Sequence, residues 1–264
     1  PTVNAMKSNC LLAILLLTAA VTAHAGTEPA APIIIEPETT SEGWWFRAAP
    51  YGWVTAIDGD MRIGPLNAPV DVSMKDSLQD LDMAAMGILE AGYGRWSLGV
   101  DITYAKVSQE IDGGGRLFRN FRLEQKQWVI NPTIAYRAIE TDGYFMEVFG
   151  GVRVNVMEAE LTGRFVGGGQ VAAEASVDWV DPVVGVRGQA DLAERWFFRY
   201  NGDIGGFGAA SDLTWQVFCG FGFRVNEALS LGLGYRALGT DYSKGSFALD
   251  TVTHGPLLGL ELRW

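Results

Sequence analysis

Leu257–Trp264, with the sequence LLGLELRW, is the stretch that decides the fold. Successive side chains of an extended strand point to opposite faces, so Glu261 and Arg263 share one face and apolar side chains share the other. Such a strand fits a half-buried position in a soluble sandwich. It also fits a membrane barrel, in which the apolar face meets lipid and the polar face meets the lumen. The apolar face consists of Leu258, Leu260, Leu262 and Trp264.

The same alternation recurs through the preceding sequence, from Trp44 onward. Apolar and polar positions alternate within Trp128–Arg137, Tyr144–Asn155, Leu213–Arg224 and Leu229–Arg236. No apolar segment in this part of the chain reaches the roughly 20 residues that a spanning helix needs. The 33 glycines and the aromatic content of 11% also favour an all-β protein of short alternating strands.

Three features favour the membrane barrel over the sandwich. Aromatic side chains gather at strand ends, as where Tyr93 and Trp96 flank the turn Gly94-Arg95, and such rings are typical of the membrane interface. Short connections alternate with longer polar stretches, as do the periplasmic turns and external loops of membrane barrels. The sequence also ends within a strand, on an aromatic residue. The longer stretches, which we predict to be external loops, are Ser108–Arg116, Ala159–Gln170, Gly208–Asp212 and Gly239–Ser246.

We therefore predict a single antiparallel up-and-down transmembrane β-barrel of ten strands, with eight or twelve strands as the alternatives. Residues 55–82 leave the strand number open, because they form a long first external loop, an inserted plug or two further spanning strands. Within them, Ala68–Met74 is a candidate strand and Lys75–Leu81 a candidate helix that begins at Asp76 or Ser77. The predicted strands are 44–54, 83–93, 95–108, 117–138, 143–158, 171–190, 195–207, 212–225, 228–240 and 247–264.

Residues 1–25 are predicted to be a signal peptide with a short upstream extension. Lys7 precedes the apolar stretch Cys10–Val21, which is too short to span a membrane, and Ala23-His24-Ala25 has the small-x-small pattern of a cleavage site. Residues 26–43, rich in Pro, Thr and Glu, form a predicted periplasmic leader, and residues 44–264 form the barrel. The predicted location is the outer membrane of a Gram-negative bacterium.

The charge argues against nucleic acid as a partner. The formal charge is −11, and loss of residues 1–25, which hold one lysine and no carboxylate, lowers it to −12. Binding to a phosphate backbone requires a basic face instead. Cleavage would also leave Cys219 as the one cysteine, which excludes an intrachain disulfide and a thiolate metal site.

Several segments resemble known outer-membrane barrels. Ser211–Gln216, Gly220–Arg224 and Leu233–Arg236 are similar to the closing hairpins of small barrels of the OmpA, OmpX and OmpW type. Over residues 44–264 the chain more closely resembles an uncharacterised proteobacterial outer-membrane family. This resemblance implies the fold and the location, and supplies no catalytic motif. The closer likeness rests on Ala49–Trp53, Val72–Asp82, Val177–Pro182 and Leu257–Trp264.

The resemblance also assigns a role to the closing strand. Its outward leucines and final tryptophan are similar to the C-terminal signal that the barrel assembly machinery reads during insertion. The predicted assembly signal therefore consists of Leu258, Leu260, Leu262 and Trp264.

Charged residues fall on the predicted lumen face of nearly every strand. Unpaired charge in a narrow, low-dielectric interior costs on the order of several kcal/mol, so we expect these charges to pair with one another. The result would be a plugged lumen and a structural or surface-interaction role. The alternative is a narrow passive channel for small solutes, although side chains nearly fill so small a barrel. The predicted lumen charge network is Glu90, Asp101, Arg137, Glu147, Arg153, Asp181, Arg187, Arg199, Asp203, Arg224, Arg236, Glu261 and Arg263.

A lipid-modifying outer-membrane hydrolase is the third hypothesis. His254 would lie on the lipid-facing side near the external interface, where Ser243, Ser246 or Asp241 could join it in a Ser–His arrangement. No flanking motif supports this arrangement, so we predict no catalytic residue, no enzyme activity and no cofactor.

Metal binding is the last chemistry considered. Asp178 with Asp181, or Asp241 with Asp250, could bind a hard cation together with loop carbonyls. Acidic outer loops more often meet the divalent ions that bridge lipopolysaccharide phosphates, so we predict no dedicated metal site. The expected partners are outer-membrane lipids, lipopolysaccharide and the barrel assembly machinery, and the expected oligomeric state is a monomer.

Overall fold

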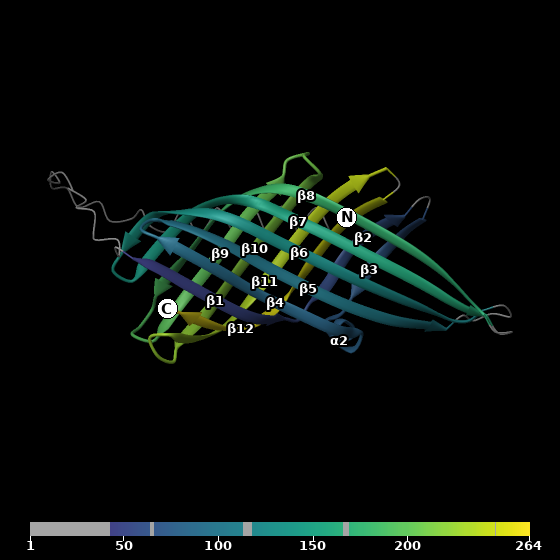
Figure 1. The fold of residues 1–264 in the computed structure, drawn as a ribbon, viewed down its shortest axis with the longest axis horizontal. Coiled ribbons are helices and arrows are strands. Elements are labelled where there is room, and N and C mark those ends of the chain that lie inside the picture. Colours follow the sequence, from purple (N-terminus) through teal and green to yellow (C-terminus); the bar gives the residue numbers. More distant parts are fainter. Residues whose placement is uncertain (1–42, 64–65, 113–117, 166–168, 246) are drawn as a thin grey trace, which may run out of the picture. The chain divides into compact units, whose positions relative to one another are not determined.

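Ten antiparallel strands close into a barrel (Figure 1). The computed structural model describes residues 43–63, 66–112, 118–165, 169–245 and 247–264. Each strand pairs with the next along the chain, and β1 closes the barrel by pairing with both β4 and β12. The barrel strands are β1 (Trp44–Trp53), β4 (Leu81–Tyr93), β5 (Trp96–Asp112), β6 (Phe118–Thr141), β7 (Tyr144–Phe165), β8 (Gln170–Asp191), β9 (Trp196–Gly206), β10 (Ser211–Arg224), β11 (Leu229–Lys244) and β12 (Phe247–Arg263).

The predicted fold class and all ten predicted strands are confirmed. The prediction succeeds because each wall strand separates an apolar outer face from a polar lumen, which imposes an alternation on the sequence. The predicted signal peptide and most of the predicted leader, residues 1–42, lie outside the described residues.

Residues 55–82 form neither a plug nor two spanning strands, so those two alternatives are wrong. They contain β2 (Ala56–Ile63), β3 (Leu66–Val72) and α2 (Met74–Gln79). β2 continues the register of β1 along β12, and β3 pairs with β2 alone. The hairpin β2–β3 therefore extends the sheet past the barrel closure. The segment predicted as a long external loop is thus a hairpin of paired strands.

The predicted short helix is present, but its start differs from the prediction. Ser73 is the N-cap, and its hydroxyl accepts a 3.2 Å hydrogen bond from the backbone N–H of Asp76. Asp76 and Ser77, the predicted starting residues, lie inside the helix. Serine and aspartate both cap helices well, so composition alone could not choose between them.

Where the structure describes them, the predicted external loops are largely paired strand; residues 113–116, 166–168 and 246 of these loops lie outside the described residues. β6, β7 and β8 contain 24, 22 and 22 residues, whereas about 9–11 tilted residues cross a bilayer. In Figure 1 these teal and green strands run on together to a common tip. We call this end of the barrel the long-strand end, and the end with the turns at Gly94-Arg95 and Asp142-Gly143 the short-turn end.

An aromatic belt surrounds the short-turn end. Trp44 packs on Tyr93 with ring centroids 5.5 Å apart, and Trp96 packs on Tyr136 at 5.0 Å. Beyond this belt, exposed aliphatic side chains cover the outer wall. Within the described residues, no helix has the length and apolar character needed to cross a membrane. The exposed outer wall residues include Leu89, Leu98, Ile134, Val148, Val184, Ile204, Leu233 and Leu258.

Candidate functional site in the barrel lumen

Seven inward-facing side chains near the short-turn end form one alternating chain of arginines and glutamates. Arg187 connects two glutamates, with Nε 2.8 Å from Glu147 and Nη1 2.5 Å from Glu90. Arg47 likewise connects Glu90, at 2.7 Å, to Glu261, at 2.9 Å. The chain is completed by Arg137 on Glu147 at 3.2 Å and by Arg199 on Glu261. In order, this arginine–glutamate chain is Arg137, Glu147, Arg187, Glu90, Arg47, Glu261 and Arg199.

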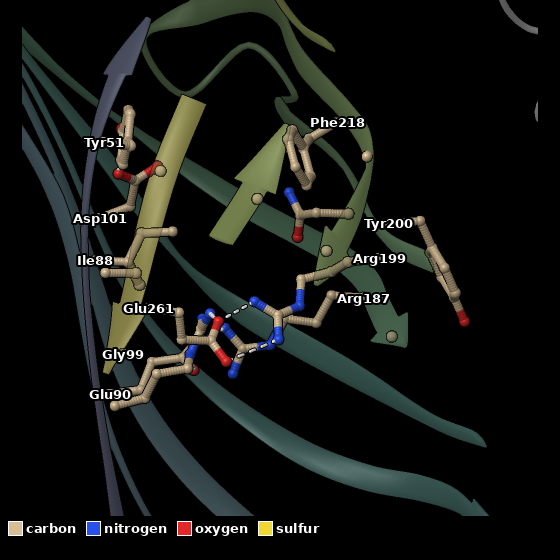
Figure 2. A pocket seen from close by; sticks show the side chains of 18 of the residues that line it. Tyr51, Ile88, Glu90, Gly99, Asp101, Arg187, Arg199, Tyr200, Phe218 and Glu261 are labelled. Carbon is tan, nitrogen blue, oxygen red and sulfur yellow. Dashed lines mark hydrogen bonds and ion pairs between the residues drawn. The ribbon is translucent and has the colours of Figure 1, made fainter. Parts of the chain in front are cut away.

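This chain crosses the lumen instead of following the wall. Arg187 on β8 reaches Glu90 on β4, and Arg199 on β9 reaches Glu261 on β12, although neither pair of strands is adjacent. Figure 2 shows Arg187 and Arg199 extending from one side of the lumen toward the two carboxylates on the other. These side chains therefore meet across the middle of the lumen.

A second polar layer lies deeper in the barrel and centres on Arg153. Its side chain is 1% exposed, so its charge must be satisfied internally. The guanidinium donates to Asp203 at 2.8 Å, to the Thr214 hydroxyl at 2.7 Å and to the Asn131 carbonyl oxygen at 2.8 Å. These partners come from three other strands, so Arg153 ties them together across the interior.

Arg236 is the second arginine of this layer. It donates to Gln216 at 2.6 Å and to the Tyr51 hydroxyl at 2.8 Å, and lies 3.1 Å from Asp101. Its guanidinium also lies over the Trp53 ring, 4.7 Å from the centroid. A buried guanidinium with this many donors engaged avoids most of the cost of desolvation.

An apolar cluster lies toward the long-strand end. Trp179 and Tyr242 stack with their ring centroids 4.3 Å apart, and Leu249 packs beside them. Partly buried Met61, Met157, Val177, Ala210 and Phe247 surround this group. We call these eight residues the apolar cap.

Ten of the thirteen predicted network residues meet in the two polar layers. The other three do not pair as predicted. Asp181 accepts two hydrogen bonds from Ser211 instead of binding an arginine. Arg224 pairs with Asp191 at the short-turn end, where both side chains are about one-third exposed. Arg263 is exposed over the Trp45 ring, and water can solvate its charge there.

Sequence reasoning missed Arg47, the residue that joins the two halves of the arginine–glutamate chain. Trp44, Trp45 and Phe46 precede it, so β1 begins with three aromatic residues that hide the alternation of faces. Tyr51 was missed for a related reason, because an amphipathic aromatic ring can face either lipid or lumen. Counting by twos along β1 from Trp53 would have placed both residues inward.

A cavity of about 200 Å³ remains between the arginine–glutamate chain and the opposite wall. In Figure 2 the Phe218 ring lies above this space, and the Tyr200 ring points away from it. The cavity extends from exposed Arg263 at the short-turn end to buried Arg153. The lumen is therefore mostly filled, but it is not solid.

The residues of the predicted assembly signal face outward, as their alternating positions in the strand predict. Leu258, Leu260, Leu262 and Trp264 are all exposed on the outer wall. Cys219 is a free, exposed thiol on the same outer face. Among the described residues, no group of three or more His, Cys, Asp or Glu side chains could hold a metal ion.

His254 does not form the Ser–His arrangement considered from the sequence. Its Nδ1 lies 2.5 Å from the Tyr235 hydroxyl and its Nε2 lies 2.8 Å from Asp58. Both ring nitrogens are therefore engaged by partners other than serine. Ser246, one of the predicted partners, lies outside the described residues.

No protein-family model matches the sequence, and no curated protein sequence matches it significantly. Among solved structures, the outer membrane protease OmpT from Escherichia coli is similar, with a TM-score of 0.53 and 11% identity over 87% of this chain and 99% of that chain. The chain has the fold of an outer-membrane β-barrel. At this level of identity the likeness concerns the fold alone.

Two further solved structures give lower scores. The attachment invasion locus protein Ail of Yersinia pestis gives a TM-score of 0.36 at 11% identity, over 84% of this chain and 99% of that chain. Neisserial surface protein A gives 0.33 at 13% identity with the same coverage. These scores are too low to bear on the fold or on the role.

Proposed function

We propose that this protein is an outer-membrane barrel with a closed lumen and a structural or surface-interaction role. The observation that carries the proposal is the arginine–glutamate chain, which joins β8 to β4 and β9 to β12 across the lumen. The apolar cap adds a second closure toward the long-strand end. A barrel closed twice is suited to presenting a surface more than to passing solutes.

The orientation follows from the general architecture of bacterial barrels, whose short turns face the periplasm. The long-strand end, with β6–β8 and the hairpin β2–β3, then faces the environment. Outer-membrane lipids and lipopolysaccharide contact the apolar wall, and the barrel assembly machinery inserts the protein as a monomer.

Reconstitution of the purified protein into planar lipid bilayers tests the closed lumen. We expect a flat current across the accessible voltage range, because no path free of buried ion pairs crosses the barrel. Steady single-channel steps from the unaltered protein would contradict the proposal. They would favour the second candidate, a narrow passive channel, which the cavity of about 200 Å³ supports.

We further propose that the protein is not an enzyme. The support is the engagement of both His254 nitrogens by Tyr235 and Asp58. The purified barrel is incubated with lipopolysaccharide and phospholipid, and the lipids are then analysed by mass spectrometry. A product that forms with the unaltered protein and is lost in His254→Ala would overturn this part of the proposal.

A further inference from the structure

We propose that the lumen cavity is a binding site for one small organic carboxylate, which enters from the short-turn end. This inference rests on the closed lumen proposed above, because a ligand held in an open channel would simply pass through. Four features of the cavity support the inference: its shape, its charge, the uncovered backbone in one wall and its size.

The cavity reaches solvent at the short-turn end. At the short-turn end its lining includes the exposed side chain of Arg263, so solvent reaches it there. At the inner end its lining includes Arg153 and Val183, which are 1% and 2% exposed. The apolar cap lies beyond. A molecule that enters past Arg263 therefore stops against the second polar layer.

The charge around the entrance is unbalanced. Seven arginines and five carboxylates line the cavity, so its lining holds more positive than negative side chains. Arg263 adds to this excess at the entrance, because Glu261, the carboxylate that acts on it, already pairs with Arg47 and Arg199. This excess is notable in a chain with a formal charge of −11. The arginines are Arg47, Arg137, Arg153, Arg187, Arg199, Arg236 and Arg263, and the carboxylates are Glu90, Asp101, Glu147, Asp203 and Glu261.

A planar guanidinium fork binds a carboxylate through two parallel hydrogen bonds. The Arg263 guanidinium lies over the Trp45 ring, 5.7 Å from the centroid, which holds it at the mouth of the pocket. A carboxylate that reaches it replaces water and neutralises the excess charge. The ligand is therefore an anion, and its acidic group lies toward the entrance.

One wall of the pocket is unexpectedly bare. Two glycines of β10 that line it are covered: the Phe197 ring lies on Gly222, and the Phe218 ring lies close to Gly220. Gly232 also lines the pocket, but a Cβ built on it would meet nothing within 4 Å. Glycine inside a strand weakens it and often marks a place where a ligand approaches the backbone. Packing explains the covered glycines, and only an occupant explains Gly232.

The size and lining of the pocket fit a short apolar body. A cavity of roughly 150 Å³ with apolar walls holds a benzene molecule, and this pocket measures about 200 Å³. Phe149, Phe197 and Phe218 supply aromatic walls, and aromatic rings pack favourably against each other. Benzoate, which joins one carboxylate to one ring, is therefore a suitable probe.

The test is titration of the full-length barrel in detergent micelles with benzoate. Binding is followed by calorimetry and by tryptophan fluorescence, since Trp45 lies at the entrance. We expect saturable one-to-one binding of benzoate and none of benzamide, which has the same shape without the charge. Arg263→Gln should weaken benzoate binding about tenfold or more, because a charged hydrogen-bonded pair is lost.

The variant Gly232→Leu tests the pocket without changing its charge. The new side chain has room to point into the cavity, so the barrel should fold and keep all its arginines while losing benzoate. Arg195→Gln, at an exposed arginine in the turn between β8 and β9, is the matched control and should bind normally. Folding of every variant is checked by the shift of the heat-modifiable band on gels.

Equal binding of benzamide, or unchanged binding in folded Gly232→Leu, would overturn the proposal, as would absence of benzoate binding to the unaltered barrel. The outcome for the closed lumen is separate, because it depends on bilayer conductance. A silent barrel that does not bind benzoate refutes the pocket alone. A conducting barrel refutes the closed lumen whatever it binds.

Discussion

Glu90 is the residue on which the arginine–glutamate chain depends most. It is buried and lies between Arg47 and Arg187, with one carboxylate oxygen on each. Neutralising it in Glu90→Gln leaves buried Arg47 and half-buried Arg187 each short of a counter-charge. We expect a loss of about 3–5 kcal/mol in unfolding free energy, the range for a broken buried pair. Guanidinium unfolding of the barrel in micelles measures this loss.

Glu140 provides the matched control for that prediction. It also binds an arginine, Arg137, at 2.7 Å, but its side chain is 31% exposed. Glu140→Gln should therefore cost only about 0–1 kcal/mol, as for other surface ion pairs. Equal losses in the two variants would mean that burial does not determine the strength of these pairs.

Much of the site at residue scale follows from the sequence. Alternation from the closing strand correctly places Glu261, Arg236 and Arg199 inside the barrel. It cannot tell which inward charges meet, because partners such as Arg187 and Glu90 lie 97 positions apart in the chain. The alternation also does not show where the lumen ends. It therefore places Arg224 and Arg263 in the lumen charge network, although water reaches both side chains.

At the scale of elements, the hairpin β2–β3 and α2 should be dispensable for folding. The barrel closes through β1 with β4 and β12, and no residue of α2 is buried. Replacing residues 56–80 by a short Gly-Ser linker should leave the heat-modifiable band and change the melting temperature by only a few degrees. Loss of the folded band would show instead that the hairpin supports the closure.

Ala48→Pro is the control for the deletion, because a single change in the closing strand should do more harm. Ala48 pairs with both Leu89 and Leu262, and proline removes a ladder hydrogen bond. We expect the folded band to be reduced or lost. The natural Pro50 is tolerated where β1 has a paired residue, Gly87, on the β4 side and a gap in its pairing with β12.

The sequence did not predict how far β6, β7 and β8 extend toward the long-strand end. Between the belt and the middle of the barrel, lipid on one side and lumen on the other impose an apolar–polar alternation. Beyond the membrane, water meets both faces of β6–β8, so the pattern fades while the pairing continues. The same loss of contrast explains why residues 55–82 resembled a loop.

At the scale of the whole molecule, a closed barrel could be predicted, but its two closures in series could not. The apolar cap brings together Met61 on β2, Trp179 on β8 and Tyr242 on β11, which no local pattern connects. The arginine–glutamate chain lies nearer the other end. If each barrier alone closes the lumen, removing one of them leaves no path for ions.

Opening one barrier should leave the lumen shut. Trp179→Ala with Tyr242→Ala empties the cap, and Glu90→Ala with Arg187→Ala removes one acid and one base from the chain without changing the net charge. In planar bilayers we expect each double variant to stay silent. Steady single-channel steps are expected when the two double variants are combined with Arg153→Ala and Asp203→Ala, which remove the ion pair of the second polar layer. Arg224→Ala with Asp191→Ala, which removes an exposed pair, is the control and should stay silent too. Steps from either double variant alone would show that the remaining barrier does not seal the barrel, and the two closures would then reduce to one.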